Sequence, residues 1–597
     1  MTELTPVRLG SRVLRVFQNL RTISRIVIEN LLDDPTYFLL QVSRRIDSGS
    51  LARIAGSCQR VLPPRAVLLR SFILMLSGNT SQLGKYLRTV DTEPLSDQKL
   101  ARLGDMAVAI QDSISTSYLL DGRDSENPAL RRTKARHAWY MGNMQEAIDL
   151  LATLVPPSNR QLRHYRSELE VFKGVLPEIG RREVPQSGEI AAPTTALHFL
   201  TNSLPHTGSG YAQRSHSIMT SLRDEKWHVE VLTRAGYPLS TGKFLAKAMD
   251  HIDGITYRRV LPRTYSSDTR SKIQQQADAL VDAVVRLKPT VLHTTTDFTN
   301  AIAVMCVAES FGLPWVYEVR GQLADTWAAT RPADAKSSQR YRLFKEREAF
   351  VASRATHVVT LGESMRSELI ARGVEDDKIS IAPNAIGDAY LDEPIERNEA
   401  RSLLGLSKSH QYVGTVSSLV AYEGLDLLVR AVAELIPENR ALRLLIVGSG
   451  VEANNLRELS IELGIDEFCI FPGRVPREDA RTYHCALDIF VVPRRNLSVT
   501  QAVTPLKPVE ALACEVPVIA ADLPALRELV EQDVTGLLVK PDDVGQLAES
   551  IRTLLADPSK RASMGAAGRK AMLADRTWAA NAQKLSATYK LIADKLQ

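Results

Sequence analysis

The chain has 597 residues, which at roughly 150 residues per domain predicts several separately packed domains. Hydrophobic residues make up 44% and charged residues 24%, a globular composition that excludes disordered, collagen-like and disulfide-dense proteins. The net charge is only +5, and the excess of basic residues lies in the N-terminal third, mostly as arginines in residues 1–88. This basic stretch favours either an anionic partner, such as lipid headgroups, or a solvated face of a helical domain.

The N-terminus shows no basic segment followed by an apolar core and a cleavage site, so we expect no signal peptide. No apolar run approaches the ~20 residues that span a bilayer, and we expect no transmembrane helix. The cysteines are scattered without Cys-x-x-Cys spacing, which predicts neither a disulfide framework nor a zinc site: Cys58, Cys306, Cys469, Cys485 and Cys514. A cytoplasmic protein fits these features.

From Arg12 to about Glu178 apolar residues recur at three- and four-residue spacing, which predicts an all-α extension over residues 1–180. Residues 135–151 resemble one tetratricopeptide hairpin with Gly142 at its turn, although no convincing copy precedes it. Residues 181–195 are rich in Pro, Gly, Ser and Ala and are interpreted as a linker.

After residue 195 short apolar segments alternate with amphipathic helical patterns, which is typical of βαβ units and parallel sheets. A first set of strands is predicted at 196–200, 228–233, 291–293, 315–319 and 357–360. A second set is predicted at 411–416, 442–447, 489–492 and 516–520. Two doubly wound domains, 196–384 and 385–562, are therefore expected to face each other across a ligand cleft.

The first predicted strand leads into a turn that contains Gly208 and Gly210, just before a predicted helix. Glycines in such a turn let backbone N–H groups approach a phosphate at the helix N-terminus. A plain tight turn remains the alternative, since two glycines alone are a weak signal.

Several segments of the second half resemble glycosyltransferase family 4, whose members use nucleotide sugars and have two Rossmann-like domains in the GT-B architecture. The segments that carry the resemblance are 360–369, 381–385, 414–426 (with Tyr-Glu-Gly at 422–424), 491–495, 504–513 (with Thr-Pro-Leu-Lys at 504–507), 516–530 and 535–543. The resemblance covers about residues 195–597 and not the helical extension. It implies sugar transfer with retention of anomeric configuration.

In that family two glutamates eight positions apart mark the donor site. Glu510 stands in the second position, where the resemblance implies a clamp on the ribose hydroxyls, and Thr504 and Leu506 precede it in the donor loop. The first position is Ala502, so the usual contact to the sugar is absent.

The family's Arg and Lys that neutralise the diphosphate fall near Ser418 and on Glu423, and a carboxylate cannot do that work. The resemblance to a subgroup with Tyr-Glu-Gly and Thr-Pro-Leu-Lys motifs points instead to Arg494 and Lys507 as the groups that stabilise the leaving diphosphate. The alternative is that Arg494 is a surface residue and Lys507 a charge at a strand end.

Arg320 occupies the place where many members of the family carry a histidine near the transferred sugar. A guanidinium does not relay protons at neutral pH, so its expected role is electrostatic. Glu318 shares a strand face with Arg320 and either pairs with it or faces the acceptor.

His293, at the end of a strand, and His206, near the glycine turn, are candidate contacts to acceptor or sugar, although isolated histidines are more often structural. They belong to no cluster with metal-ligand spacing. We expect no metal and no separate cofactor.

The sequence thus predicts a metal-independent, retaining glycosyltransferase of the hexosyltransferase type, with its donor on residues 385–562 and its acceptor on 196–384. Residues 563–597 are expected to cross back onto the first Rossmann-like domain. The acceptor is a glycan, a glycolipid or a small molecule, with cell-envelope assembly favoured. Residues 1–180 are candidates for contact with the inner membrane or a protein partner, and no nucleic acid is expected. The alternative is a non-catalytic scaffold with a degenerate transferase body and a helical protein-binding domain.

Overall fold

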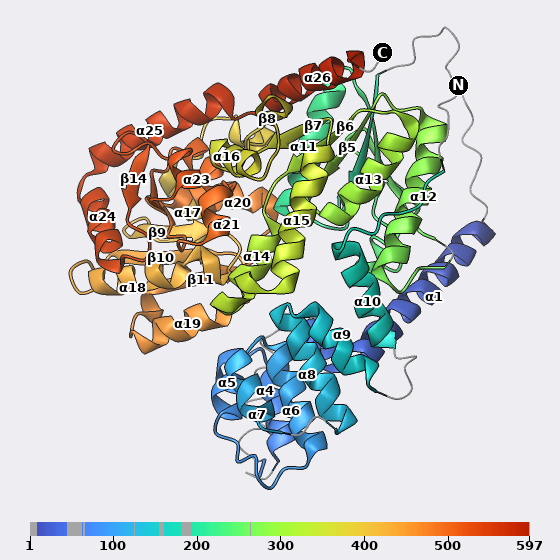
Figure 1. Cartoon of the computed structure of the whole chain (residues 1–597). Helices are drawn as coiled ribbons and strands as arrows, with labels where there is room; N and C mark the ends of the chain where they lie inside the picture. Colours follow the sequence, from blue (N-terminus) through green and yellow to red (C-terminus); the bar gives the residue numbers. More distant parts are fainter. Residues whose placement is uncertain are drawn as a thin grey trace.

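The computed structural model describes residues 9–43, 62–63, 66–123, 126–154, 160–180, 194–262 and 264–595. Cys58 and residues 181–193 of the predicted linker lie outside this set. An all-helical extension precedes two α/β domains, and in Figure 1 most of it lies below them, while its first helix runs up beside the first α/β domain. Among the described residues no helix is long and apolar enough to cross a membrane.

The extension consists of nine described helices, and its sequence-predicted helical character is confirmed. They are α1 (Leu9–Asp33), α2 (Pro35–Ser43), α4 (Val67–Leu76), α5 (Thr80–Leu87), α6 (Asp97–Ala109), α7 (Ser113–Leu120), α8 (Pro128–Met141), α9 (Met144–Ala152) and α10 (Arg160–Phe172). Helices α2 and α4–α8 enclose a core of their own. Helices α8–α10 also contribute to the core of the first Rossmann-like domain, where the Phe172 ring meets Phe298 and Phe344.

The turn between α8 and α9 docks the extension onto the following domain. Gly142 ends α8 with φ +93°, and a Cβ there would lie 2.3 Å from Ser338 Oγ and 2.7 Å from the Trp327 ring. Its carbonyl accepts a hydrogen bond of 2.9 Å from the backbone N–H of Arg340. Only glycine satisfies both the left-handed backbone and this close approach. The helical hairpin is present, but a tetratricopeptide identity does not follow from it.

The first Rossmann-like domain is built on an eight-stranded sheet of order β3-β4-β2-β1-β5-β6-β7-β8. The strands are β1 (Thr195–Leu200), β2 (His228–Thr233), β3 (Met249–Ile252), β4 (Ile255–Arg259), β5 (Val291–Thr295), β6 (Trp315–Val319), β7 (His357–Thr360) and β8 (Ile379–Ile381). The helices are α11 (Gly210–Asp224), α12 (Thr269–Leu287), α13 (Phe298–Phe311), α14 (Leu323–Ala329), α15 (Gln339–Arg354) and α16 (Glu363–Ala371). The expectation of a parallel sheet needs one correction, because β3 pairs antiparallel with β4.

The second Rossmann-like domain holds a six-stranded parallel sheet of order β11-β10-β9-β12-β13-β14. The strands are β9 (Gln411–Val416), β10 (Leu442–Val447), β11 (Cys469–Gly473), β12 (Ile489–Val492), β13 (Val518–Ala521) and β14 (Gly536–Val539). The helices are α17 (Arg397–Leu403), α18 (Leu425–Leu435), α19 (Ala453–Glu462), α20 (Arg477–Ala486), α21 (Ser498–Ala502), α22 (Lys507–Ala513), α23 (Pro524–Arg527), α24 (Val544–Ala556) and α25 (Pro558–Asp575).

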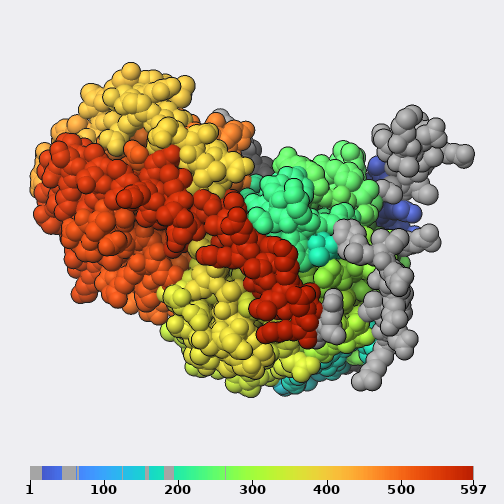
Figure 2. All heavy atoms as spheres, turned by 90° about the horizontal axis from the view of Figure 1, so that it is seen from above, coloured from blue at the N-terminus to red at the C-terminus, as the bar shows by residue number. Residues whose placement is uncertain are grey.

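The last helix, α26 (Trp578–Asp594), runs from the second Rossmann-like domain onto the first and packs against α11. In Figure 2 it forms the red ridge that joins the two bodies. Trp227 Nε1 donates to Ser586 Oγ at 2.9 Å, and the buried Tyr589 ring meets Trp227 edge-on. The helix α25 before it stays on the second domain, against α22 and α24.

Candidate active site between the two Rossmann-like domains

A cavity of about 340 Å³ lies where the carboxyl ends of strands from both sheets meet. The first domain contributes residues that follow β1, β5 and β6, and the second contributes residues that follow β9 and β12. Its lining comprises Thr201, Asn202, Tyr211, Ser215, Thr295, Thr296, Asp297, Arg320, Gly321, Leu323, Thr326, Tyr422, Arg494, Val499, Thr500 and Val503. Parallel α/β sheets bind ligands at this edge.

Two of the predicted site residues, Arg320 and Arg494, line this cavity from opposite domains. Arg320 follows β6 directly, and its Nη1 donates to the Tyr211 carbonyl at 2.9 Å and to Ser215 Oγ at 2.8 Å. Its Nη2 lies 2.5 Å from Glu318 Oε2. The ion pair between Glu318 and Arg320, one of the two alternatives that the sequence left open, is therefore formed.

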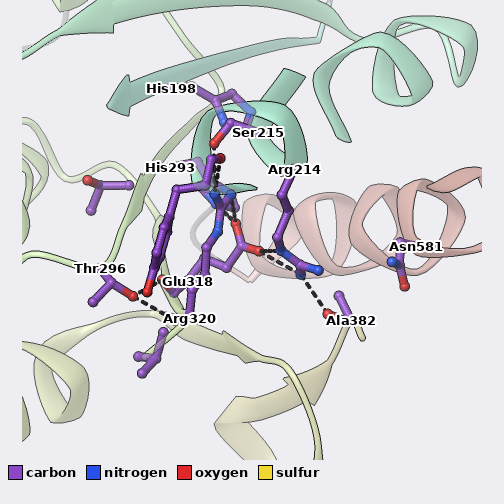
Figure 3. Close-up of polar contacts among 12 residues, drawn as sticks. His198, Arg214, Ser215, His293, Thr296, Glu318, Arg320, Ala382 and Asn581 are labelled. Atoms are coloured by element: carbon purple, nitrogen blue, oxygen red, sulfur yellow. Dashed lines mark hydrogen bonds and ion pairs between the residues drawn. The ribbon is translucent and has the colours of Figure 1, made fainter. Parts of the chain in front are cut away.

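Glu318 is 1% exposed and lies at the centre of the network drawn in Figure 3. Its carboxylate contacts Arg214 at 2.7 Å as well as Arg320, and it lies 3.2 Å from His293 Nε2. Burial alone would raise the pKa of Glu318, but the two guanidinium groups outweigh burial and hold that pKa well below its usual range. Glu318 is thus an ionised, fully partnered carboxylate inside the domain.

Arg214, which sequence reasoning missed, connects this network to the junction between the domains. It lies on α11 and donates to the carbonyls of Pro383 at 2.8 Å and Ala382 at 2.6 Å. A signal was available in the sequence: residues 211, 214 and 215 share one face of the helix that follows the glycine turn. Tyr211 and Ser215 of that face line the cavity.

His293 is fully buried and faces the crossing helix rather than the cavity. Its Nδ1 lies 2.5 Å from Tyr589 Oη on α26, and its ring stacks on His198 with centroids 4.5 Å apart. Burial lowers the pKa of His293, although its hydrogen bond to Glu318 opposes this shift. A neutral histidine in this position orients α26.

His206 lies in a second polar cluster beside the glycine turn. Its Nε2 is 3.2 Å from Asp250 Oδ2, and the same carboxylate oxygen is held by Arg259 at 2.9 Å. Burial lowers the pKa of His206, with Asp250 acting in the opposite direction. This cluster joins the β1–α11 turn to β3.

Gly208 and Gly210 lie in that turn, and nothing in the protein itself requires glycine there. Neither has a positive φ, a Cβ on Gly210 would meet no atom within 4 Å, and one on Gly208 would only reach Arg474 and Gln213 at 4.0 Å. Ser209 caps α11 by accepting from the backbone N–H of Ala212. The space over the two glycines is open toward the second domain.

Arg474 and Arg477 are exposed residues of the second domain that face this turn. Arg474 Nη2 is the atom nearest to a Cβ on Gly208, and Arg477 donates to Gln213 of α11. Arg474 follows β11, a strand that sequence reasoning missed because its residues are only partly buried. Within the described residues neither arginine forms an ion pair.

In the second domain Arg494 is held by Glu423 in a two-pronged ion pair with distances of 3.0 and 2.7 Å. Its Nη1 donates to the Val503 carbonyl at 2.8 Å. Gly424, in the left-handed region at φ +67°, lets this loop approach Pro493, since a Cβ there would lie 2.2 Å from the Pro493 carbonyl oxygen. The Tyr-Glu-Gly motif is thus the partner of Arg494, and the surface-residue alternative does not apply, because Arg494 is 6% exposed.

The other predicted donor residues lie together at the start of α22, immediately after the cavity-lining Val503. Lys507 Nζ donates to Glu510 Oε2 at 2.8 Å, with the lysine side chain 37% exposed and the glutamate 6%. Lys507 begins a helix and does not end a strand. The Thr504 carbonyl accepts from Asn384 at 2.9 Å, and its buried hydroxyl has no partner among the described residues. Leu506 stands directly before α22 and makes no side-chain hydrogen bond to it, and Ala502 is buried at the end of α21.

Both Rossmann-like domains match families of known proteins. Residues 209–385 match the family described as "Glycosyl transferase 4-like domain", and residues 396–571 match "Glycosyl transferases group 1". The predicted glycosyltransferase domains are therefore confirmed, and both matched ranges lie after the helical extension.

Among curated proteins, the chain is similar to a GDP-mannose-dependent alpha-(1-6)-phosphatidylinositol monomannoside mannosyltransferase of Mycolicibacterium smegmatis. The two are 32% identical over 208 residues, which is 34% of this chain and 54% of that protein. It is 27% identical to D-inositol 3-phosphate glycosyltransferase of Nocardia farcinica over 410 residues, which is 66% of this chain and 88% of that protein. The chain spans about half the length of the mannosyltransferase.

Among solved structures, sucrose-phosphate synthase from Thermosynechococcus elongatus superposes with a TM-score of 0.58 at 21% identity, covering 67% of this chain and 100% of the other. HepE of Anabaena in complex with UDP gives 0.53 at 18% identity, with 66% and 100% covered. These likenesses confirm the predicted GT-B fold.

Proposed function

We propose that the chain is a glycosyltransferase that moves a sugar from a nucleoside diphosphate to an acceptor held by the first Rossmann-like domain. The observation that carries this proposal is the cavity at the carboxyl ends of both sheets, which Arg320 and Arg494 line from opposite sides. The two glycosyltransferase family matches, one on each domain, support it.

The donor binds at the start of α22. In the Lys507–Glu510 pair the lysine is partly exposed and the glutamate is buried. Each group has a role toward a donor: the carboxylate accepts from two ribose hydroxyls, and the ammonium neutralises a phosphate oxygen. Thr504, whose buried hydroxyl has no partner among the described residues, and Leu506 belong to the same donor site. The open space over Gly208 and Gly210, with Arg474 opposite, leaves room for phosphate groups to approach backbone N–H groups.

Arg494 and Arg320 act on the charge that develops as the diphosphate leaves. Glu423 neutralises the charge of Arg494. The guanidinium therefore acts on the diphosphate through those N–H groups that do not bind Glu423. Arg320 shares Glu318 with Arg214, which leaves the buried group of three with one positive charge in excess. Positive groups that are fixed before the reaction stabilise a transition-state anion without reorganisation.

The reaction proceeds with retention and without a metal. The acceptor oxygen forms a bond to the anomeric carbon as the bond from that carbon to the phosphate oxygen breaks. The acceptor proton passes to the departing phosphate oxygen, so no protein nucleophile is required. Because Ala502 replaces the family's first glutamate, contacts to the sugar come from other lining residues, and His293 and Glu318 are too buried to supply them.

The acceptor is a glycan or glycolipid of the cell envelope, glycosylated at the cytoplasmic face. The names of relatives that act on phosphatidylinositol mannosides and on inositol phosphate favour an acceptor with a polyol or sugar hydroxyl.

The experiment is a donor screen on the full chain. UDP- and GDP-sugars are offered with lipid extracts, and release of the nucleoside diphosphate is measured for the wild type, Lys507→Ala and Glu510→Ala. Release with one donor, reduced at least ten-fold in both variants, supports the proposal, and NMR of the product tests retention. Ile461→Glu, an exposed change on α19, is the control.

A scaffold remains the second candidate, favoured by Ala502 and Glu423. It predicts no turnover with any donor, a cellular effect that survives Lys507→Ala and Glu510→Ala, and loss of that effect when residues 1–180 are removed. Turnover with one donor would exclude it.

A further inference from the structure

Helix α1 turns its apolar face away from the protein. Six apolar side chains of this helix are at least one-third exposed: Phe17 (66%), Leu20 (42%), Val27 (38%), Ile28 (53%), Leu31 (42%) and Leu32 (66%). At about 100° per residue they span about 140° of the helix surface. A helix on the surface of a globular protein normally turns such a stripe inward.

The opposite, polar face of α1 holds the helix in this orientation. Asn19 is 3% exposed and donates from Nδ2 to the carbonyls of Phe244 at 3.0 Å and Ala246 at 2.9 Å. Glu29, 9% exposed, pairs with Arg160 of α10 at 2.8 Å. The orientation of α1 is therefore fixed by specific polar contacts, and the apolar stripe is left for another surface.

The segment 242–248, which Asn19 holds, carries further exposed apolar and basic side chains next to α1. Phe244 is 48% and Leu245 68% exposed, and the flanking Lys243 and Lys247 are exposed as well. Arg21 and Arg25 are also exposed. At about 100° per residue Arg21 lies within the apolar stripe of α1 and Arg25 at its edge, where Arg25 Nε pairs with Glu29 at 2.9 Å. The described acidic side chains of α1, Glu29 and Asp33, instead point toward the protein, where they pair with Arg160.

We propose that the stripe of α1 and the segment 242–248 form a docking surface for a bilayer with anionic headgroups. Apolar side chains bordered by basic ones, on a helix that lies flat, match the boundary between acyl chains and anionic headgroups. When two helices pair as a coiled coil, only the a and d positions of each heptad face the partner. The apolar stripe of α1 is wider than that. A two-fold pair would also bring the exposed Arg21, Lys243 and Lys247 of two copies together, since the described acidic side chains of α1 point toward the protein.

The docking surface includes a segment of the first Rossmann-like domain, the domain that forms one side of the cavity. The segment 242–248 leads into β3, whose Asp250 binds His206 in the turn that carries Gly208 and Gly210. A bilayer that binds this surface therefore brings a lipid-borne acceptor to the first Rossmann-like domain. This last step rests on the proposed glycosyltransferase function, whereas the docking itself does not.

The test is flotation of the full chain with vesicles of phosphatidylcholine, alone or mixed with phosphatidylglycerol. The wild type floats with the mixed vesicles and much less with phosphatidylcholine alone. Leu20→Glu with Ile28→Glu abolishes flotation, and Lys243→Gln with Lys247→Gln weakens partitioning about ten-fold or more. The matched control, Leu403→Glu with Ile461→Glu, changes two exposed apolar residues of the second domain, which are more exposed than Leu20 and Ile28, and leaves flotation unchanged.

Flotation that is absent in the wild type, or retained in the Leu20→Glu, Ile28→Glu variant, overturns the proposal. So does sedimentation equilibrium that shows a wild-type dimer which this variant dissociates, since the stripe is then covered by a second copy. All variants keep wild-type melting and nucleotide binding. If the protein floats with the vesicles but turns over no donor, the proposed glycosyltransferase function is wrong, whereas the proposed docking surface is still supported.

Discussion

The two Rossmann-like domains hold the charged residues of the candidate site in opposite ways. In the first domain Glu318, Arg214 and Arg320 are each less than 5% exposed and form a network that joins α11, β6 and the junction at 382–384. In the second domain Lys507 is 37% exposed and has Glu510 as its ion-pair partner. The charges of the first network are fully paired inside the domain. In the second domain the lysine can exchange its glutamate partner for a ligand group with only a small loss of free energy.

This difference separates residues that shape the site from residues that bind. Charges that are buried and fully partnered cost several kcal/mol to disrupt, because removing one leaves another buried without compensation. An ion pair with a partly exposed member, such as Lys507, contributes about 1 kcal/mol to stability, and the exposed member exchanges readily for a ligand's groups. We therefore expect mutations of Glu318 and Arg214 to act on folding, and mutations of Lys507 and Glu510 to act on donor binding.

The largest effect is expected for Glu318→Gln. It leaves the buried Arg214 and Arg320 with one carboxylate fewer and should lower the free energy of unfolding by about 3–5 kcal/mol. Denaturant melts measure this loss. Glu230→Gln is the matched control: Glu230 is also buried, but its partner Arg258 is partly exposed, and about 1 kcal/mol is expected. Equal losses in the two variants contradict a special role for the Glu318 network.

A gain of binding is expected for Glu423→Gln. The change keeps the shape of the side chain that holds Arg494 but removes the charge that matches it. Affinity for a nucleoside diphosphate should rise about five- to ten-fold, because the freed positive charge then faces the diphosphate in the cavity. Calorimetry at two salt concentrations checks this, since the gain should shrink as salt screens the charge. Unchanged or weaker binding means that Arg494 does not face the diphosphate.

The smallest effect on stability is expected for a glycine substitution, and two glycines of the chain should differ clearly from each other. Gly210→Ala places a Cβ in open space and should change stability by less than about 0.5 kcal/mol. Gly424→Ala places a Cβ 2.2 Å from the Pro493 carbonyl at positive φ and should cost about 2 kcal/mol or more. Thermal melts compare the two. If phosphates occupy the space over Gly210, Gly210→Ala still weakens donor binding; binding at wild-type strength would place the phosphates elsewhere.

Much of the fold follows from the sequence because buried parallel strands are continuous apolar runs. The predicted segments 228–233 and 442–447 coincide with β2 and β10, whose residues are nearly all buried. The edge strand β3 was missed because its residues are exposed or half-exposed and its pattern lacks such a run. Short βα units and turn signals therefore predict the centre of each sheet better than its margins.

The site was only partly predictable because its partners are far apart in the sequence. Arg320 and Arg494 were identified from local motifs, but Arg214 binds Glu318 across 104 positions and Tyr589 binds His293 across 296. No local sequence pattern indicates that α26, which crosses between the domains, supplies a hydrogen-bond partner for a residue of β5. The periodicity of α1 similarly predicted a helix but not that its polar face would be the buried one.

The measurement that tests the account most directly is calorimetric titration of UDP, GDP and ADP into the wild type, Lys507→Ala and Glu510→Ala. The account predicts that one diphosphate binds, that each variant weakens it about ten- to a hundred-fold through a lost charged hydrogen bond, and that both melt as the wild type does. No binding of any of the three, or binding that both substitutions leave unchanged, would contradict a donor site at the start of α22.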